Sequence, residues 1–245
     1  MTWLTGRQSG TPQLLGWVVD VQRDFMDPDG RLYVHDLTDP TDPGARMARG
    51  AIVRAVTWMR ARCATIVFTG DWHAYGDREI DSVAPDPLKG TYPPHCMGMS
   101  PGPREREGAS LLPEIAPNES ALVLSRHATE VEARAVARDA VRSARPVFLQ
   151  KSEFSCFSGN SGTDTLLAEL AAVLGESFEV LVCGVATDVC VRHAVEGMLD
   201  RGLAVSVIRD ATWGLGLLPS SETWDRWRSR GARVLRMGDL ERAGS

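Results

Sequence analysis

The chain has 245 residues and a formal net charge of −5, with 43% hydrophobic and 24% charged residues. This size fits one large globular domain, and the acidic balance argues against nucleic acid or an anionic membrane as a partner. No apolar run approaches the roughly 20 residues of a membrane span, and five cysteines without a C-x-x-C pair favour a reducing, cytoplasmic compartment.

Residues 1–13 are polar and rich in turn formers, so we expect a flexible N-terminal segment that is not a secretory signal. Residues 14–245 then form a single domain in which strand-like and helix-like segments alternate. In chain order these are strand 14–21, helix 45–63, strand 64–69, apolar run 121–124, helix 129–142, strand 147–150, helix 166–174, strand 180–183, helix 188–201, strand 203–208, helix 221–230 and strand 232–235. The alternation predicts a three-layer α/β/α domain around a parallel sheet.

Four residues with complementary chemistry follow predicted strands: Asp20, Asp71, Lys151 and Cys190. Because the carboxyl ends of parallel strands meet at one edge of a sheet, chemistry collects there. Beside a thiol, a carboxylate can take the proton and an ammonium can hold the thiolate. Turns also favour polar residues at strand ends, which is the alternative interpretation for each residue alone.

Cys190 lies in the most informative segment of the chain. Gly184 ends the apolar run 180–183, Thr187 offers a helix N-cap, and Asp188 falls in the first helical turn. Cys190 would then lie near a helix start, where the dipole favours a thiolate. A buried cysteine that only fills the core is the alternative.

The stretch from residue 70 to 117 has many glycines and prolines and little periodicity, and loops of this length are usually functional. It carries Asp71, His73 and His95, which are suitable ligands for zinc, iron or manganese. Ordinary loop residues are the equally open alternative. Glu79 is one of several nearby acids that could supply a fourth ligand.

Several segments in chain order resemble the isochorismatase-like cysteine hydrolases, most closely the nicotinamidase branch. They are Asp20-Val21-Gln22-Arg23-Asp24-Phe25, Asp71-Trp72-His73, Tyr92-Pro93-Pro94-His95-Cys96, Lys151-Ser152-Glu153-Phe154-Ser155-Cys156-Phe157, Gly184-Val185-Ala186-Thr187-Asp188-Val189-Cys190-Val191 and Asp210-Ala211-Thr212. The resemblance runs from residue 14 to about residue 213.

This resemblance implies a six-stranded, mostly parallel sheet and a catalytic triad of Asp20, Lys151 and Cys190. It also implies a cis peptide between Val185 and Ala186, which would aim the N–H groups of Ala186 and Cys190 into an oxyanion hole.

By the same resemblance, Asp71, His73 and His95 would hold a divalent metal ion, zinc before iron or manganese, with no organic cofactor. Phe25 and Tyr92 would flank the ring of the substrate. Tyr92 replaces the more usual tryptophan, and acids replace a second histidine often found after Asp-Trp-His. A helix at about 128–146 looks inserted, and it would cap the site or form a subunit contact.

The sequence therefore predicts a cysteine-dependent amidohydrolase that converts a small aromatic carboxamide to a carboxylate and ammonia, with the amide as its partner and a homo-oligomeric assembly. Within the family, the alternatives are an isochorismatase-type vinyl-ether hydrolase and a hydrolase of N-carbamoyl or other amides. Outside it, the alternative is a non-catalytic regulatory protein on the same fold.

Overall fold

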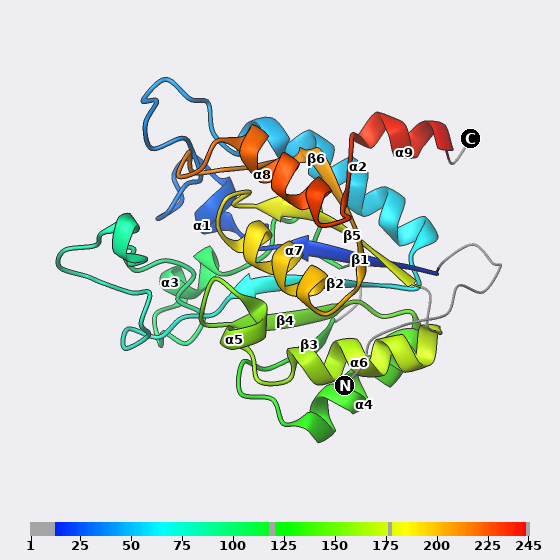
Figure 1. Ribbon diagram of the computed structural model, residues 1–245. Coiled ribbons are helices and arrows are strands. Elements are labelled where there is room, and N and C mark those ends of the chain that lie inside the picture. Colours follow the sequence, from blue (N-terminus) through cyan, green and yellow to red (C-terminus); the bar gives the residue numbers. More distant parts are fainter. Residues whose placement is uncertain (1–12, 118–120, 176–177, 244–245) are drawn as a thin grey trace.

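A seven-stranded parallel sheet forms the centre of the molecule (Figure 1). The structure is a computed structural model that describes residues 13–117, 121–175 and 178–243. The strands are β1 (Gln13–Val19), β2 (Thr65–Asp71), β3 (Leu122–Leu124), β4 (Val147–Lys151), β5 (Phe178–Val185), β6 (Ala204–Trp213) and β7 (Arg233–Leu235). Their order across the sheet is β3-β4-β2-β1-β5-β6-β7. The α/β class and the parallel sheet are confirmed, but the strand count of six is one too low, because the short apolar run at 121–124 pairs with β4 as the edge strand β3.

Helices cover the two faces of this sheet. They are α1 (Arg23–Met26), α2 (Arg46–Arg62), α3 (Pro103–Gly108), α4 (Glu130–Ser143), α5 (Cys156–Gly159), α6 (Thr163–Leu174), α7 (Cys190–Asp200), α8 (Ser220–Ser229) and α9 (Met237–Ala243), with a 3₁₀ turn η1 (Pro87–Lys89). Helix α2 contacts β1, β2, β5 and β6, and α7 crosses β1, β5 and β6 in front of the sheet (Figure 1). Ile52, Val56 and Met59 lie on the buried face of α2, as the helical spacing of its apolar residues predicts, but Met47, the fourth residue of that pattern, is 60% exposed in the first turn of the helix.

The strands β1 and β5 are paired along their whole length and are almost entirely buried. The prediction that Gly184 ends the fifth strand is wrong, because β5 continues to Val185. Gly184 has a φ of 123°, and a Cβ there would lie 2.0 Å from the carbonyl oxygen of Val19. The glycine therefore allows the two strand ends to approach closely, which brings the residues that follow them together.

The helix after β5 starts later than the sequence predicts. Helix α7 begins at Cys190, and its N-cap is Val189 instead of Thr187. The carboxylate of Asp188 does not cap the helix but accepts hydrogen bonds from the N–H groups of Leu215 and Leu217, at 2.9 and 2.7 Å. Asp188 thus holds the loop after β6, and Cys190 becomes the first helical residue.

The helix predicted near 128–146 is α4, which begins with the predicted capping box of Thr129 and Glu132. It connects the parallel strands β3 and β4 and contacts β3 and α6. None of its residues lines the cavity described below, so the structure offers no support for a capping role. Its status as an insertion stays a prediction. The flexible segment predicted at residues 1–13 lies, except for Gln13, outside the described residues. Among the described helices, none has the length and apolarity to cross a membrane.

Candidate active site

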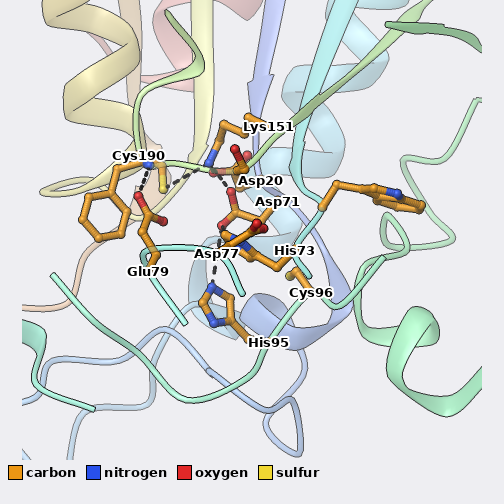
Figure 2. A network of polar contacts seen from close by, with 12 residues as sticks. Asp20, Asp71, His73, Asp77, Glu79, His95, Cys96, Lys151 and Cys190 are labelled. Atoms are coloured by element: carbon orange, nitrogen blue, oxygen red, sulfur yellow. Dashed lines mark hydrogen bonds and ion pairs between the residues drawn. The ribbon is translucent and has the colours of Figure 1, made fainter. Parts of the chain in front are cut away.

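Four adjacent strands bring the predicted catalytic and metal-binding residues together at the carboxyl ends of the strands. In the order β4, β2 and β1, the strands end at Lys151, at Asp71 and just before Asp20, and the neighbouring β5 is followed by a short turn to Cys190. All four side chains are buried, and they point toward one another (Figure 2). Because neighbouring strands lie about 4.8 Å apart, the sheet alone places these residues within reach of their neighbours.

Lys151 lies at the centre of this group. Its Nζ is 2.9 Å from Oδ2 of Asp20 and 3.7 Å from Sγ of Cys190, and it also contacts Oδ1 of Asp71. A carboxylate oxygen of Asp20, one of Asp71 and the Cys190 sulfur all lie within 4.8 Å of one another. The hydroxyl of Thr69 donates to Oδ1 of Asp20 at 2.6 Å, which leaves Oδ2 facing the lysine and the thiol.

Burial decides the protonation of this group. It raises the pKa of Cys190 well above its usual value despite the nearby ammonium of Lys151, which is the reverse of the predicted thiolate. Burial likewise raises the pKa of Asp20 and outweighs the opposite effect of Lys151. For Lys151, burial opposes the charge, but Asp20 and Asp71 raise the pKa well above its usual value. The thiol is therefore protonated at rest and needs a base, and the nearest carboxylates are in place to serve.

The backbone around Cys190 offers donors for an oxyanion. The Val185–Ala186 peptide is cis, as the resemblance implies. The carbonyl of Ala186 accepts hydrogen bonds from Val189 and Val191, at 3.1 and 3.0 Å, which shapes the turn into α7. As the first residue of α7, Cys190 has an N–H without an acceptor inside the helix, at its positive end. Ala186 and Cys190 both line the cavity, so their N–H groups are candidates for the oxyanion hole.

Asp71, His73 and His95 form a second cluster beside the first, with one donor atom from each lying within 4.8 Å of the others. The Nε2 atoms of His73 and His95 lie 3.7 and 3.8 Å from Oδ2 of Asp71. The Nδ1 of His95 donates to the carbonyl of Pro93 at 2.7 Å, so its Nε2 keeps a free lone pair. Two imidazoles and a carboxylate facing one point are a donor set for a divalent transition metal.

A buried ring nitrogen that lacks a hydrogen-bond partner in the described part of the chain supports the interpretation of these three residues as a metal-binding group. Nε2 of His73 is buried and has no hydrogen-bond partner among the described residues, while its Nδ1 lies 3.2 Å from Oδ2 of Asp77. Burial opposes a charge on this ring, but the nearby carboxylates of Asp71 and Asp77 raise the pKa of His73 to about 9. The surroundings thus favour positive charge at this point, and the three residues can hold a divalent metal ion.

Glu79, the acid considered as a fourth ligand, is buried close to both clusters. One of its carboxylate oxygens accepts the N–H of Phe154 at 2.6 Å, and the other has no partner among the described residues. Burial and the charge of Asp71 raise its pKa to about 8. Glu79 is not one of the three residues whose donor atoms converge.

A small cavity that opens to solvent lies in front of Cys190. Its wall includes the predicted Phe25 and Tyr92, whose rings lie 5.3 and 6.2 Å from the ring of His95. Phe154, 5.8 Å from Tyr92, completes an aromatic wall that the sequence analysis did not assign. Phe154 lies three residues after Lys151, in a segment that resembles the family, and this position was the feature of the sequence that could have identified it. Leu32, Val34 and Leu215 also line the cavity, and no pattern in the sequence marked them because they lie in loops.

Comparison with known proteins finds similarity along most of the chain. A family model described as the isochorismatase domain matches residues 129–239. The nicotinamidase of Escherichia coli K12 is 24% identical over 236 residues, covering 91% of this chain and 95% of that protein. The nicotinamidase/pyrazinamidase of Mycobacterium tuberculosis is 29% identical over 203 residues, covering 81% and 85%.

Among solved structures, the pyrazinamidase of Pyrococcus horikoshii in complex with zinc matches with a TM-score of 0.62 and 24% identity, over 92% of this chain and 99% of that one. The chain thus contains a region similar to the isochorismatase domain, and its fold is similar to that of the solved pyrazinamidase. The two curated relatives are both named as nicotinamidases.

Proposed function

We propose that the protein is a nicotinamidase-type cysteine amidase, which hydrolyses a small aromatic carboxamide to a carboxylate and ammonia. The observation that carries this proposal is the position of Lys151 Nζ, 2.9 Å from Asp20 and 3.7 Å from Cys190. Cys190 also forms part of an apolar, aromatic cavity. The relatives named nicotinamidase support the choice of an aromatic amide.

The first half of the proposed reaction forms a thioester. Asp20 takes the proton of the Cys190 thiol, and the thiolate attacks the carboxamide carbon, so that a C–S bond forms and the carbonyl electron pair moves to oxygen. The N–H groups of Ala186 and Cys190 stabilise that oxyanion. The C–N bond then breaks, and Asp20 returns its proton to the leaving nitrogen, which departs as ammonia.

The second half consumes one water molecule. Asp20 takes a proton from water, the resulting hydroxide attacks the thioester carbon, and the C–S bond breaks. The thiolate recovers its proton, and the carboxylate product leaves. Lys151 stays charged throughout, because two buried carboxylates surround it, and it holds the thiolate at each stage.

The metal ion is part of the proposal. Asp71, His73 and His95 would hold it, with zinc preferred over iron or manganese, as the zinc complex of the Pyrococcus horikoshii relative supports. When bound, such an ion supplies a Lewis-acid site that anchors a basic heteroatom of the substrate. Phe25 and Tyr92 would flank the ring at this position, and the proposal requires no organic cofactor.

Cellular location, oligomeric state and the alternative functions complete the proposal. All five cysteines are free, which supports the proposed cytoplasmic location. The homo-oligomer expected from the sequence stays a prediction. The vinyl-ether hydrolase is disfavoured because Cys190 and the three metal-binding residues are all present, and a non-catalytic protein is disfavoured because all three triad residues are present.

The test is ammonia release from nicotinamide, pyrazinamide, benzamide and an N-carbamoyl amino acid, with the native protein, Cys190→Ala and Cys63→Ala. Cys63 is the matched control because it ends α2 and does not line the cavity. We expect release from the pyridine amides by the native and Cys63→Ala proteins, and a loss of roughly 10⁴-fold or more in Cys190→Ala. Release by Cys190→Ala at the native rate would reject the nucleophile, and release from the N-carbamoyl compound alone would reject the substrate.

A further inference from the structure

The acid behind His73 is held by an arginine from a distant part of the chain. Arg126 follows β3, and its Nη1 and Nη2 lie 2.5 and 3.1 Å from the two carboxylate oxygens of Asp77. Nη1 also donates to the carbonyl of Trp72 at 3.0 Å. The side chains of Arg126 and Asp77 are only 11% and 12% exposed, so solvent screens this two-pronged ion pair less than it screens a surface pair.

The ion pair determines which nitrogen of His73 carries the proton. Oδ2 of Asp77 accepts a hydrogen bond from the N–H of Ala74 at 2.9 Å. The same oxygen lies 3.2 Å from Nδ1 of His73 (Figure 2). A carboxylate paired with a guanidinium fork is ionised and can only accept hydrogen bonds. Nδ1 of His73 is therefore the donor, and in the neutral ring, which is the form that binds a metal ion, the lone pair lies on Nε2, which faces Asp71.

The two histidines of the cluster differ in what orients them. The ring of His95 is held by a backbone carbonyl, that of Pro93, and depends on no other side chain for this bond. The ring of His73 depends on Asp77, and Asp77 depends on Arg126. Lysine cannot replace this arginine fully, because an ammonium lacks the planar fork that binds both carboxylate oxygens.

We propose that Asp77 and Arg126 are positioning residues that set the metal affinity of the site by fixing the ring of His73. The inference rests on the metal site of the proposed function. It makes the β3–α4 connection, which lies outside the loop that carries the ligands, part of the metal centre. Partners of this kind behind a ligating histidine typically change metal affinity by 10- to 100-fold.

The direction in which metal affinity changes when Arg126 is removed distinguishes a positioning role from a purely electrostatic one. If Arg126 acted only as a positive charge near the site, its removal would tighten the binding of a cation. If it positions His73 through Asp77, its removal weakens binding. Arg126→Lys keeps the charge but loses the fork, so positioning predicts an intermediate affinity, whereas a charge effect predicts no change.

The experiment measures the dissociation constants of Zn²⁺ and Co²⁺ by competition with a chromophoric chelator, together with the visible spectrum of the Co²⁺ protein. The variants are Asp77→Asn, Arg126→Ala, Arg126→Lys and His73→Ala. The matched control is Arg138→Ala, which removes an exposed arginine of α4 that pairs with Glu169 at 2.6 Å. Thermal unfolding of each metal-free protein shows whether it folds.

We expect Asp77→Asn and Arg126→Ala to weaken Zn²⁺ binding by about 10- to 100-fold with an altered Co²⁺ spectrum, Arg126→Lys to lie between them and the native protein, and Arg138→Ala to change nothing. Native affinity in Asp77→Asn and Arg126→Ala, or tighter binding in Arg126→Ala, would overturn the inference while leaving the metal site intact. A native protein that binds no metal, or His73→Ala that binds as the native protein does, would instead reject the metal site of the proposed function.

Discussion

The triad cluster of Asp20, Lys151 and Cys190 and the metal cluster of Asp71, His73 and His95 lie side by side but are built differently. In the triad cluster, Asp20 and Lys151 lie at the ends of β1 and β4, and Cys190 begins α7 after the short turn that follows β5, so paired strands and a tight turn place its members. In the metal cluster, only Asp71 ends a strand, while His73 and His95 belong to the loop after β2.

Buried hydrogen bonds from side chains to the backbone hold that loop in place beyond the end of β2. Gln22 donates to the carbonyls of Asp71 and Ala109, at 2.9 and 2.8 Å, and accepts the N–H of Asp71 at 2.8 Å. Asp24 accepts the N–H of Cys96, the residue after His95, at 2.7 Å. We therefore expect substitutions in the triad cluster to lower turnover or global stability, and substitutions around the metal-cluster loop to lower metal affinity first.

The largest effect is expected from Asp20→Asn. The amide keeps the shape and can still accept from Thr69, but it cannot take the thiol proton. We expect the kcat for ammonia release to fall by about 10²- to 10⁴-fold, with little change in metal content. Turnover within a factor of three of the native rate would show that Asp20 is not the base.

Lys151→Met tests the stability side of the comparison. The change leaves the carboxylates of Asp20 and Asp71 buried beside each other without a cation. We expect the free energy of unfolding to fall by about 3–5 kcal/mol, measured by urea denaturation. Arg138→Ala, which breaks an exposed pair, serves as the control and should cost less than about 1 kcal/mol. Equal losses in the two variants would contradict the central position of Lys151.

Removal of the metal ion should leave the sheet intact. Because the strands place the triad cluster, we expect the chelated protein to keep its circular dichroism spectrum while losing ammonia release. Restoring Zn²⁺ at 100 times its dissociation constant should stabilise the protein by about 2.7 kcal/mol in thermal unfolding. Full activity in a protein shown to be metal-free would separate the metal cluster from the reaction.

The last prediction concerns Glu79 and pH. Its pKa of about 8 lies above its ordinary value of 4.5, so between these pH values the folded protein keeps a proton that the unfolded chain has lost. The stabilisation from Glu79 is therefore complete below pH 4.5 and is lost as the pH rises through 8.

We expect metal-free Glu79→Gln to lose less stability than the native protein between pH 5 and pH 8, measured by urea denaturation at both values. Glu130→Gln, a change at an exposed residue, should follow the native protein. An unchanged difference between the two pH values in Glu79→Gln would contradict the raised pKa.

The segments of the triad cluster were predictable because each sits next to a long apolar run. Buried parallel strands read as continuous hydrophobic segments, and the residue at the end of such a segment lies at the edge where sites form. Asp20 and Lys151 accordingly lie at the carboxyl ends of β1 and β4, whereas Cys190 lies beyond the end of β5, at the start of α7. Local capping chemistry likewise predicted the start of α4, because the capping box involves residues only three positions apart.

Long-range partners decided what the sequence analysis missed. Asp188 caps no helix because N–H groups of the loop after β6 reach its carboxylate. Arg126 reaches Asp77 across 49 positions of the chain, and no local pattern signals such a pair. The same holds for the protonation of Cys190, which the start of a helix suggested would be a thiolate.

The sequence by itself determined the order of strands and helices, the chemistry at the strand ends and the side chains proposed to bind the metal ion, because these depend on residue type and local spacing. Only the tertiary structure decided the order of strands in the sheet, the partners that orient each histidine and the proton on the thiol. Those properties depend on burial and on contacts between distant segments, which come into existence when the chain folds.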